Sequence, residues 1–516
     1  MMAARLRQSV LAATIVLAAA CSPREESAPD RPVEPAVLRR GLGAEPDTLD
    51  PQHAEDNAAL AVLGDLYEGL TRSQSDGTAE FGAAESWDIS SDGRTYVFKL
   101  RRDLRWSNGD ALTAAHFAAT LEMLTAPGST APQAGLYAAI EGVFAEDDRT
   151  LRVQLARPMP HLIELLALAA AAPRHPTAAP SAQAPAPPPG NGAFRLRERI
   201  VGEQISLERN PNYWDAARVA LDAVVYRTIT DLGTELNLYR TGELDITSEV
   251  PNTHLAALRV ERPAELHVTP YLGTYSYAVN LARLPDRDAR RALAMAVDRE
   301  RITRQVTGAG ERPAYGWIPD GIPAYAPARF PWQVLQYPEA VREARAAWAA
   351  ASARGAAPKR VALCTDASAN HHRTAVALAD LWHSALGVDT EIIELEWTVY
   401  LDRRRSPGDC DLMRLGWSAD FVAPEAFAGV FESGHPQNTL GYRSARYDSL
   451  LERSRTAPTA GERMTLIASA EAQLLADVAV IPIFFRVSKR LVSSDVVGVR
   501  ANPLGQLVSR DLELRR

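Results

Sequence analysis

Lysine and cysteine are scarce in this 516-residue sequence, and long hydrophobic runs are almost absent. The only lysines are Lys99, Lys359 and Lys489, so arginine carries nearly all of the basic charge. The formal net charge is −8, and a chain with this balance has no overall positive field to attract the phosphates of nucleic acid. We therefore expect no nucleic-acid partner.

The one clear apolar run, residues 10–20, follows Arg5 and Arg7. A membrane-spanning helix needs about 20 apolar residues, so this run is too short to span, and no other segment qualifies. Its basic flank and the small residues before Cys21 are typical of a secretory signal. We expect residues 1–20 to be a lipoprotein signal peptide, Cys21 to be the lipidated residue, and residues 21–36 to be a flexible tether.

This reading places the protein on the periplasmic or cell-surface side of a membrane, held there by its lipid. Simple signal cleavage without lipidation is the alternative. Beyond Cys21 the only cysteines are Cys364 and Cys410, which could form one disulfide in an oxidising compartment. Sequence separation does not reveal distance in space, so two unpaired buried thiols are the other possibility.

Catalytic and metal-binding motifs are missing as well. The sequence has no Gly-x-Ser-x-Gly elbow, no His-Glu-x-x-His helix and no phosphate-binding glycine loop. No Cys/His cluster has the spacing of metal ligands, and the adjacent His371 and His372 would point in different directions on a helix. We therefore expect no enzyme and no resident metal or cofactor, with a secreted hydrolase as an alternative.

Hydrophobic residues make up 46% of the chain and charged residues 23%, the balance of a globular protein whose length predicts two to four domains. Apolar residues at helical spacing predict helices over residues 60–70 and 462–476. Alternating residues predict a β-hairpin from segments 87–89 and 95–100. The Ala- and Pro-rich residues 167–189 are interpreted as a surface excursion at a domain boundary.

Several short motifs occur in the order and spacing seen in the extracellular solute-binding proteins of family 5, which serve ABC importers. The sequence therefore resembles this family. These motifs are EPDTLDP (45–51), YEGL (67–70), ESW (85–87), WSNGD (106–110) and RNPNYW (209–214). Within that family the resemblance is closest to the oligopeptide-binding members. It rests on NGAF (191–194), YRTGELD (239–245), PYLGTY (270–275), PAYG (313–316) and RLGWSAD (414–420).

The resemblance implies a two-lobed, three-domain α/β fold of the periplasmic binding protein type, class C cluster, with a discontinuous domain I and a ligand enclosed between the lobes. On this basis the expected bounds are residues 37–68, 190–272 and 488–516 for domain I, residues 69–189 for domain II, and residues 273–487 for domain III.

Asp420 is the main candidate for ligand binding. A peptide ammonium is costly to desolvate unless a carboxylate meets it, and Trp417 and Phe421 beside Asp420 could exclude water. In the oligopeptide-binding members the acid of the Gly-Trp-Cys-Ala-Asp motif meets the peptide α-amine, and the resemblance gives Asp420 that role. A helix cap or a surface carboxylate is the duller alternative.

The resemblance also directs Glu55, His371 and Arg414 toward the bound peptide, the last two able to meet its C-terminal carboxylate. Arg414 could instead pair with an internal acid, and His371 could belong to a solvated helix start. The candidate wall residues are large aromatics, which could equally lie in the core: Tyr275, Trp397 and Trp417.

Two departures from the oligopeptide-binding pattern concern the binding site. Gly273 and Ser418 stand where those members have a cysteine pair, so that disulfide is missing here. Thr307 stands where relatives offer a lysine to the ligand C-terminus, which leaves the preferred peptide length open.

The sequence thus predicts the monomeric substrate-binding lipoprotein of a peptide ABC importer, with short peptides and permease subunits as partners. Alternatives are a binder of another ligand of this family (a dipeptide, nickel chelate, heme or sugar), a hydrolase, or a sensor or chaperone that has lost transport.

Overall fold

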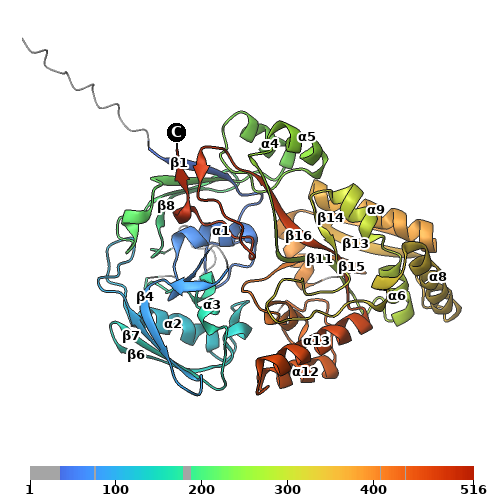
Figure 1. The fold of residues 1–516 in the computed structure, drawn as a ribbon, viewed down its shortest axis with the longest axis horizontal. Coiled ribbons are helices and arrows are strands. Elements are labelled where there is room, and N and C mark those ends of the chain that lie inside the picture. The colour runs from blue at the N-terminus through green and yellow to red at the C-terminus, as the bar shows by residue number, and fades with distance from the viewer. Residues whose placement is uncertain (1–34, 75–76, 178–187, 407, 436, 516) are drawn as a thin grey trace, which may run out of the picture. The chain divides into compact units, whose positions relative to one another are not determined.

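The computed structural model describes residues 35–74, 77–177, 188–406, 408–435 and 437–515. The expected signal peptide, Cys21 and nearly all of the expected tether lie outside these residues. Contacts gather the chain from Ala36 onward into one compact unit, which contains three larger sheets with flanking helices (Figure 1). Within the described segments, no helix combines the length and apolar character needed to cross a membrane.

The first sheet has the strand order β1-β10-β9-β8, in which β1 and β10 are parallel and the other neighbours are antiparallel. Its inner face shares a core with α1 (Asn57–Leu66). The helix begins where the Asp56 carboxylate accepts a hydrogen bond from the Ala59 amide, and it ends where Tyr67 becomes extended. The prediction of a helix over residues 60–70 was therefore wrong at both ends. The strand bounds are β1 (Val37–Gly41), β10 (Ala223–Arg227), β9 (Gln204–Arg209) and β8 (Phe194–Ile200).

The second sheet is antiparallel throughout, in the order β4-β5-β7-β6. The predicted hairpin is confirmed, because β4 and β5 pair around a turn at Gly93, whose positive φ of 68° suits glycine. Helix α2 (Ala114–Thr125) covers this sheet and begins with a capping box between Thr113 and His116. The strand bounds are β4 (Ala84–Ile89), β5 (Thr95–Leu100), β7 (Thr150–Leu155) and β6 (Ile140–Asp147).

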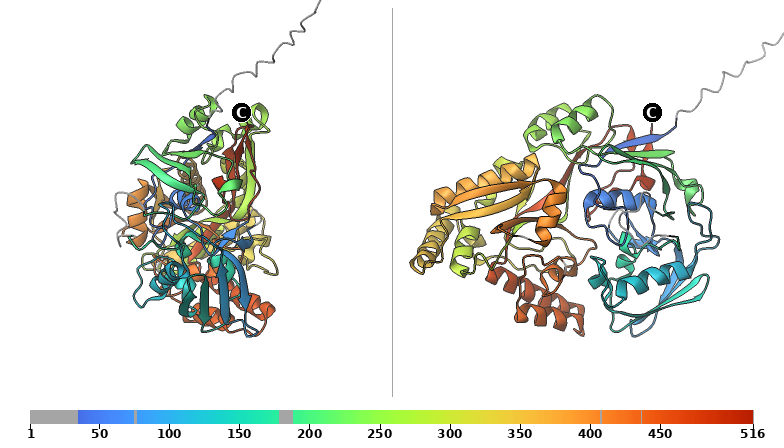
Figure 2. Two further views of the ribbon diagram at one scale, coloured as in Figure 1. Left: turned by 90° about the vertical axis from the view of Figure 1, so that its left-hand side faces the viewer. Right: turned by 180° about the vertical axis from the view of Figure 1, so that it is seen from behind.

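The third sheet has six strands in the order β12-β16-β11-β15-β13-β14. Helices α8 (Tyr337–Ala353) and α9 (Ala369–Leu386) lie on its side away from the two four-stranded sheets (Figures 1 and 2). Its long antiparallel pair, β11 with β16, runs from the first sheet toward these helices. The strand bounds are β12 (Arg312–Pro313), β16 (Val480–Leu491), β11 (Leu266–Val279), β15 (Leu412–Ser418), β13 (Arg360–Asp366) and β14 (Asp389–Leu395).

Shorter strands and further helices complete the described unit. The predicted helix over residues 462–476 is confirmed as α13 (Ala460–Asp477), which packs against α12. The other bounds are β2 (Thr71–Ser73), β3 (Ala79–Phe81), β17 (Val496–Val497), β18 (Glu513–Leu514), α3 (Leu162–Leu165), α4 (Leu232–Arg240), α5 (Leu255–Glu261), α6 (Arg287–Met295), α7 (Arg299–Arg301), α10 (Trp397–Arg405), α11 (Glu425–Ala428) and α12 (Ala445–Arg455). The expected domain bounds stay a prediction.

The start of the Ala/Pro-rich segment is buried, so the prediction of a surface excursion was wrong for this part. Ala170, Ala171 and Ala172 are each at most 2% exposed, and the Gln52 side-chain amide donates to the carbonyls of Ala170 and Ala172. Small side chains let this backbone approach its neighbours closely, which composition alone did not reveal. Residues 178–187 lie outside the described residues.

A disulfide joins Cys364 on β13 to Cys410, just before β15, with a Cα–Cα distance of 5.8 Å. Of the two possibilities left open by the sequence, the structure therefore shows the disulfide. The cross-link ties together the two strands that carry Asp366 and Arg414.

Removing the cross-link should lower stability. The bond spans a separation of 46 residues, and closing a loop of this size is worth about 2–4 kcal/mol. We expect urea unfolding of Cys364→Ala/Cys410→Ala to show a loss of this order, measured from the midpoint at an unchanged slope. Reductant should destabilise the wild type similarly and leave the double variant unaffected; an equal midpoint for both proteins would contradict the assigned role.

Candidate ligand-binding site

A cavity of about 820 Å³ is lined by strands of the first and third sheets, and its size is within the range of ligand pockets. Its lining includes segments next to β1 and α1, the central strands β11, β15 and β16, and the starts of α9 and α10. The structure brings all seven predicted ligand-binding residues to this one cavity, although their roles stay predictions. They are Glu55, Tyr275, His371, Trp397, Arg414, Trp417 and Asp420.

Strand β15 presents an edge to the cavity. It pairs with β11 along its whole length, from Leu412 to Ser418, but with β13 only at Leu412 and Met413. Beyond Met413 the second edge of β15 has no neighbouring strand among the described residues. An extended chain could therefore pair with the main chain of Gly416 to Ser418, which line the cavity.

Asp420 lies two residues beyond the end of β15, and its carboxylate is only partly exposed to the cavity. Among the described residues, no cation or hydrogen-bond donor contacts this carboxylate. Burial raises its pKa to about 6, because the charged form is deprived of water without receiving a partner. The site thus holds an acid that lacks its counter-charge.

Two aromatic residues close to Asp420 in the sequence are fixed by contacts of their own. The Trp417 indole is fixed by donating to the carbonyl of Ala426 at 2.7 Å, and Phe421 stacks on His161 with ring centroids 4.9 Å apart. Burial lowers the pKa of His161 to about 4, helped by nearby arginines, so this ring is neutral at pH 7. His161 therefore cannot supply the missing positive charge.

His371 and Arg414 are both engaged by Asp366, which lies at the end of β13. The Arg414 Nε atom is 2.5 Å from Asp366 Oδ1, and His371 Nδ1 is 3.0 Å from the same carboxylate. Burial alone would raise the pKa of Asp366. The charge of Arg414 and the contact with His371 together outweigh this effect, so the pKa lies well below its usual range. The alternative pairing of Arg414 with an internal acid is thus what the structure shows.

Burial and the charge of Arg414 lower the pKa of His371, although Asp366 acts in the opposite direction. Its neighbour His372 contacts Glu394 instead, at 2.8 Å. The two histidines therefore diverge, as adjacent residues on a helix must. In the described part of the chain, no three His, Cys, Asp or Glu side chains gather in a way that could hold a metal ion.

Glu55 approaches the cavity from the segment before α1 and contacts side chains that lie near and beyond α10. Its carboxylate accepts from Gln437 Nε2 and faces Arg405 Nη2 at 3.4 Å, while Gln437 also accepts from Arg404 at 2.8 Å. These contacts bridge segments more than 340 positions apart in sequence. Trp397 at the start of α10 walls the cavity and stacks on a buried tyrosine.

The two departures from the oligopeptide-binding pattern are visible in the geometry. Gly273 and Ser418 face each other directly across β11 and β15, so a cysteine pair at these positions would join neighbouring strands. Thr307 lines the cavity and donates to Glu311 at 2.7 Å. Glu311 in turn lies 3.4 Å from Lys489, so an ammonium group is present near this position but reaches it from β16.

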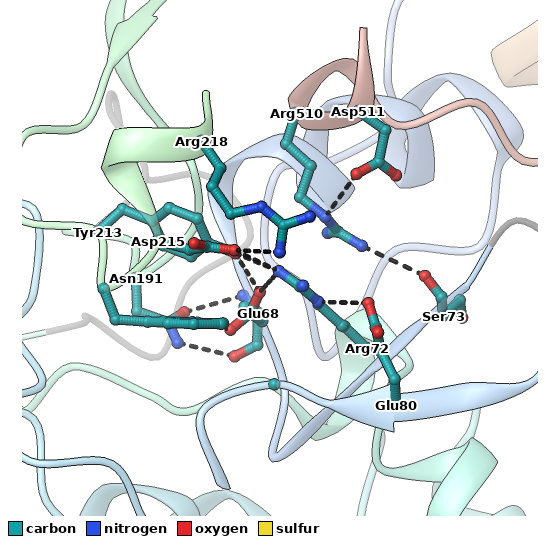
Figure 3. A network of polar contacts seen from close by, with 12 residues as sticks. Glu68, Arg72, Ser73, Glu80, Asn191, Tyr213, Asp215, Arg218, Arg510 and Asp511 are labelled. Carbon is teal, nitrogen blue, oxygen red and sulfur yellow. Dashed lines mark hydrogen bonds and ion pairs between the residues drawn. The ribbon is translucent and has the colours of Figure 1, made fainter. Parts of the chain in front are cut away.

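A polar network beside the cavity joins three of the sequence motifs (Figure 3). The Glu68 carboxylate accepts from the Tyr213 hydroxyl and the Trp214 indole, both at 2.5 Å. The Asn191 amide pairs with the Glu68 main chain in both directions, at 3.0 and 2.7 Å. Arg72, which also contacts Glu80, extends the network. The motifs YEGL, NGAF and RNPNYW thus hold one another in place.

Asp366, Arg486 and Gln437 line the cavity but were missed by the sequence reasoning. Asp366 is the last residue of the buried strand β13, and Arg486 interrupts the apolar run of β16. A charged residue in an otherwise apolar strand could have indicated both positions as candidates. Gln437 had no comparable signal, because its position depends on a loop.

Comparison with known proteins identifies the architecture. The sequence profile described as bacterial extracellular solute-binding proteins, family 5 Middle, matches residues 79–439. The chain is 34% identical to the periplasmic oligopeptide-binding protein OppA of Escherichia coli K12, over 93% of this chain and 92% of that protein. These similarities confirm the predicted fold class, that of the periplasmic binding proteins.

Two solved structures show how the described conformation compares. The structure of Haemophilus influenzae OppA in complex with the peptide RPPGFSPFR matches with a TM-score of 0.88 at 31% identity, covering 94% of this chain and 99% of that one. The unliganded open form of the periplasmic murein tripeptide-binding protein MppA matches with 0.67 at 30% identity, covering 93% and 98%. The conformation is thus closer to the peptide-bound structure.

Neutralising Asp420 should stabilise the empty protein. An acid whose pKa is raised on folding destabilises the fold increasingly as pH rises from its unfolded value to the raised value, here about 6, and the full cost is present above that. We expect Asp420→Asn to raise the free energy of unfolding by about 1–3 kcal/mol at pH 8, with the gain vanishing toward pH 4. Urea titrations at several pH values measure this.

Asp389→Asn is the matched control, since that side chain is 76% exposed and lies outside the cavity lining. It should show no comparable change with pH. A pH-independent difference between Asp420→Asn and the wild type would argue against an uncompensated carboxylate.

Proposed function

The chain belongs to the bacterial extracellular solute-binding proteins of family 5, and on this premise we propose that it captures short peptides in the cavity and delivers them to an ABC importer. The observation that carries the proposal is the uncompensated carboxylate of Asp420 at the end of an unpaired strand edge. A peptide offers both complements in one molecule, an ammonium group and an extended main chain.

The ammonium end is the more discriminating part. A desolvated carboxylate gains most from a charged donor, and such a hydrogen bond is worth about 1.5–3 kcal/mol. Trp417, which lines the same cavity and is held by its hydrogen bond to Ala426, would limit the access of water to Asp420. Sugars, heme and simple metal chelates lack an α-amine, so this geometry favours peptides over the other ligands of the family.

The main chain of the peptide supplies the remaining affinity. Strand addition along Gly416 to Ser418 uses backbone groups alone, which makes it largely indifferent to side-chain identity. Water in the rest of the cavity can bridge varied side chains at modest cost. We therefore propose binding of many sequences, with no covalent chemistry and no turnover.

Closure is proposed to accompany binding. Glu55 contacts Gln437 and Arg405 across the cavity, and the described conformation resembles a peptide-bound relative more than an open, unliganded one. Ligand contacts from both sides would shift the population toward this form. The chain would act as a monomer that presents the closed form to its permease.

The proposal is tested by calorimetry with trialanine and its N-acetylated form. Blocking the amine should reduce affinity roughly ten- to a hundredfold, and Asp420→Asn should reduce the affinity for the free peptide by a similar factor. Affinity should also fall below about pH 6, because only the carboxylate form of Asp420 pairs with the amine.

Asp389→Asn again serves as the control and should bind like the wild type. Equal affinities for the free and acetylated peptides would refute the assignment, and hydrolysis of the peptide by the purified protein would revive the hydrolase alternative.

We also propose that the protein is a lipoprotein anchored through Cys21, on the evidence of the sequence alone. The basic residues, the apolar run and the small residues before Cys21 support this. Cys21→Ala should move the protein from the membrane fraction to the soluble fraction of fractionated cells, with unchanged peptide binding. Retention of the variant in membranes would contradict the anchor.

A further inference from the structure

Arg486 differs from the other positive side chains of the cavity. Eight lysine and arginine side chains line it among the described residues. Four of them face a carboxylate within 4.0 Å: Arg72, Arg414, Lys489 and Arg510. Three others donate to an amide, hydroxyl or main-chain oxygen: Arg40, Arg404 and Arg490. Only Arg486 has no hydrogen-bond acceptor or acidic partner within the described segments.

The side chain of Arg486 lies over the strand edge where a peptide would pair. Its guanidinium lies 5.5 Å from the centre of the Tyr271 ring, and its Nη1 atom lies 3.4 Å from the point that a methyl group on Gly416 would occupy. The absence of a side chain at Gly416 therefore leaves the space that this guanidinium uses. Phe484, two residues earlier on β16, faces the same cavity.

A second guanidinium reaches the same place. Arg414 Nη1 lies 2.9 Å from the same point above Gly416, so the two arginines converge on one side of β15. The charge of Arg414 is compensated by Asp366 at 2.5 Å, whereas Arg486 forms no ion pair among the described residues and acts on Glu249 only from a longer distance. Two guanidinium groups lie close together here, and only one of them is paired with a carboxylate. A further anion would therefore be bound favourably at this place.

The nearby acids Glu249 and Glu311 do not contact Arg486. Glu249 is held by Lys489 at 3.2 Å and by the Asn370 amide at 2.7 Å. Glu311 is occupied by Thr307 and by the amide of Ala309. The charge of Arg486 does act on Glu249, but the direct contacts of both acids are with other groups, so neither forms an ion pair with Arg486.

We propose that Arg486 is a specificity-determining residue that binds a carboxylate of the ligand above Gly416. This inference rests on the proposed function, in which Asp420 fixes the ligand amine. Gly416 lies four residues from Asp420, and a chain of this length spans at most roughly 13 Å when fully extended. A peptide aligned with β15 would then bring its third or fourth residue to Arg486.

The carboxylate can come from two sources. It is either the C-terminal carboxylate of a tri- or tetrapeptide, or an acidic side chain near the third position of a longer peptide. Both present two oxygens to the planar guanidinium fork, which suits bidentate pairing. Arg486 would thus favour ligands with charges of opposite sign at a set spacing.

The test measures, by calorimetry on the full chain, how much affinity a carboxylate adds. One pair of ligands is trialanine and its C-terminal amide; the other is the amides of Ala-Ala-Glu-Ala and Ala-Ala-Gln-Ala. We expect the wild type to prefer the acid of at least one pair by roughly tenfold or more. Arg486→Gln should bring that ratio close to one, while leaving affinity for the uncharged ligand nearly unchanged.

Arg312→Gln is the matched control, because Arg312 is paired with Asp320 and its position on β12 is outside the cavity lining. It should keep the wild-type ratios. Arg486→Lys, which keeps the charge but not the fork, should give intermediate ratios and serves as the second variant if Arg486→Gln fails to fold.

The outcomes are distinct. A preference confined to the first pair identifies the terminal carboxylate, and one confined to the second pair identifies an acidic side chain; either supports the inference if Arg486→Gln abolishes it. Wild-type ratios retained in Arg486→Gln, or no carboxylate preference in the wild type, would overturn the inference while leaving amine binding intact. Failure of every peptide to bind would instead overturn the proposed function.

Discussion

Compensation of buried charge is the constraint on which this cavity depends. A charge removed from water is tolerated when a partner lies within reach, and Asp366 with Arg414 and Lys489 with Glu249 satisfy this rule. Asp420 does not, and its pKa is raised accordingly. The cavity therefore combines paired charges with two, on Asp420 and Arg486, that contact no group of opposite charge among the described residues, and the proposed ligand selectivity rests on these two.

The short motifs that indicate the family have different structural roles. Glu68, Asn191 and Tyr213 come from three motifs and bind one another (Figure 3). They fix the chain where it leaves α1 and where it returns before β8, although Glu68 also lines the cavity. The motif around Gly416 and Asp420 lines the cavity as well, but the Asp420 carboxylate has no such partner among the described residues. A resemblance built from many motifs therefore reports mainly the scaffold, and only a part of it concerns ligands.

The sequence predicted local elements and cavity-lining residues where periodicity or a motif carried the signal, as in the β4–β5 hairpin and at Asp420. It failed where the outcome depended on tertiary packing. Ala170 and its neighbours are buried because small side chains let the backbone pack closely, although their composition is that of a linker. The pairing of Asp366 with Arg414 could not be foreseen, since the residues meet only when β13 and β15 lie in one sheet.

The disulfide between Cys364 and Cys410 reinforces the pairing of Asp366 with Arg414. Asp366 follows one cysteine by two positions and Arg414 follows the other by four, so the covalent bond and the ion pair secure the same two strands. Thiols stay reduced in the cytosol and are oxidised after export. In a reducing compartment this wall of the cavity would therefore lack its covalent brace, and only the ion pair would join the two strands at this end.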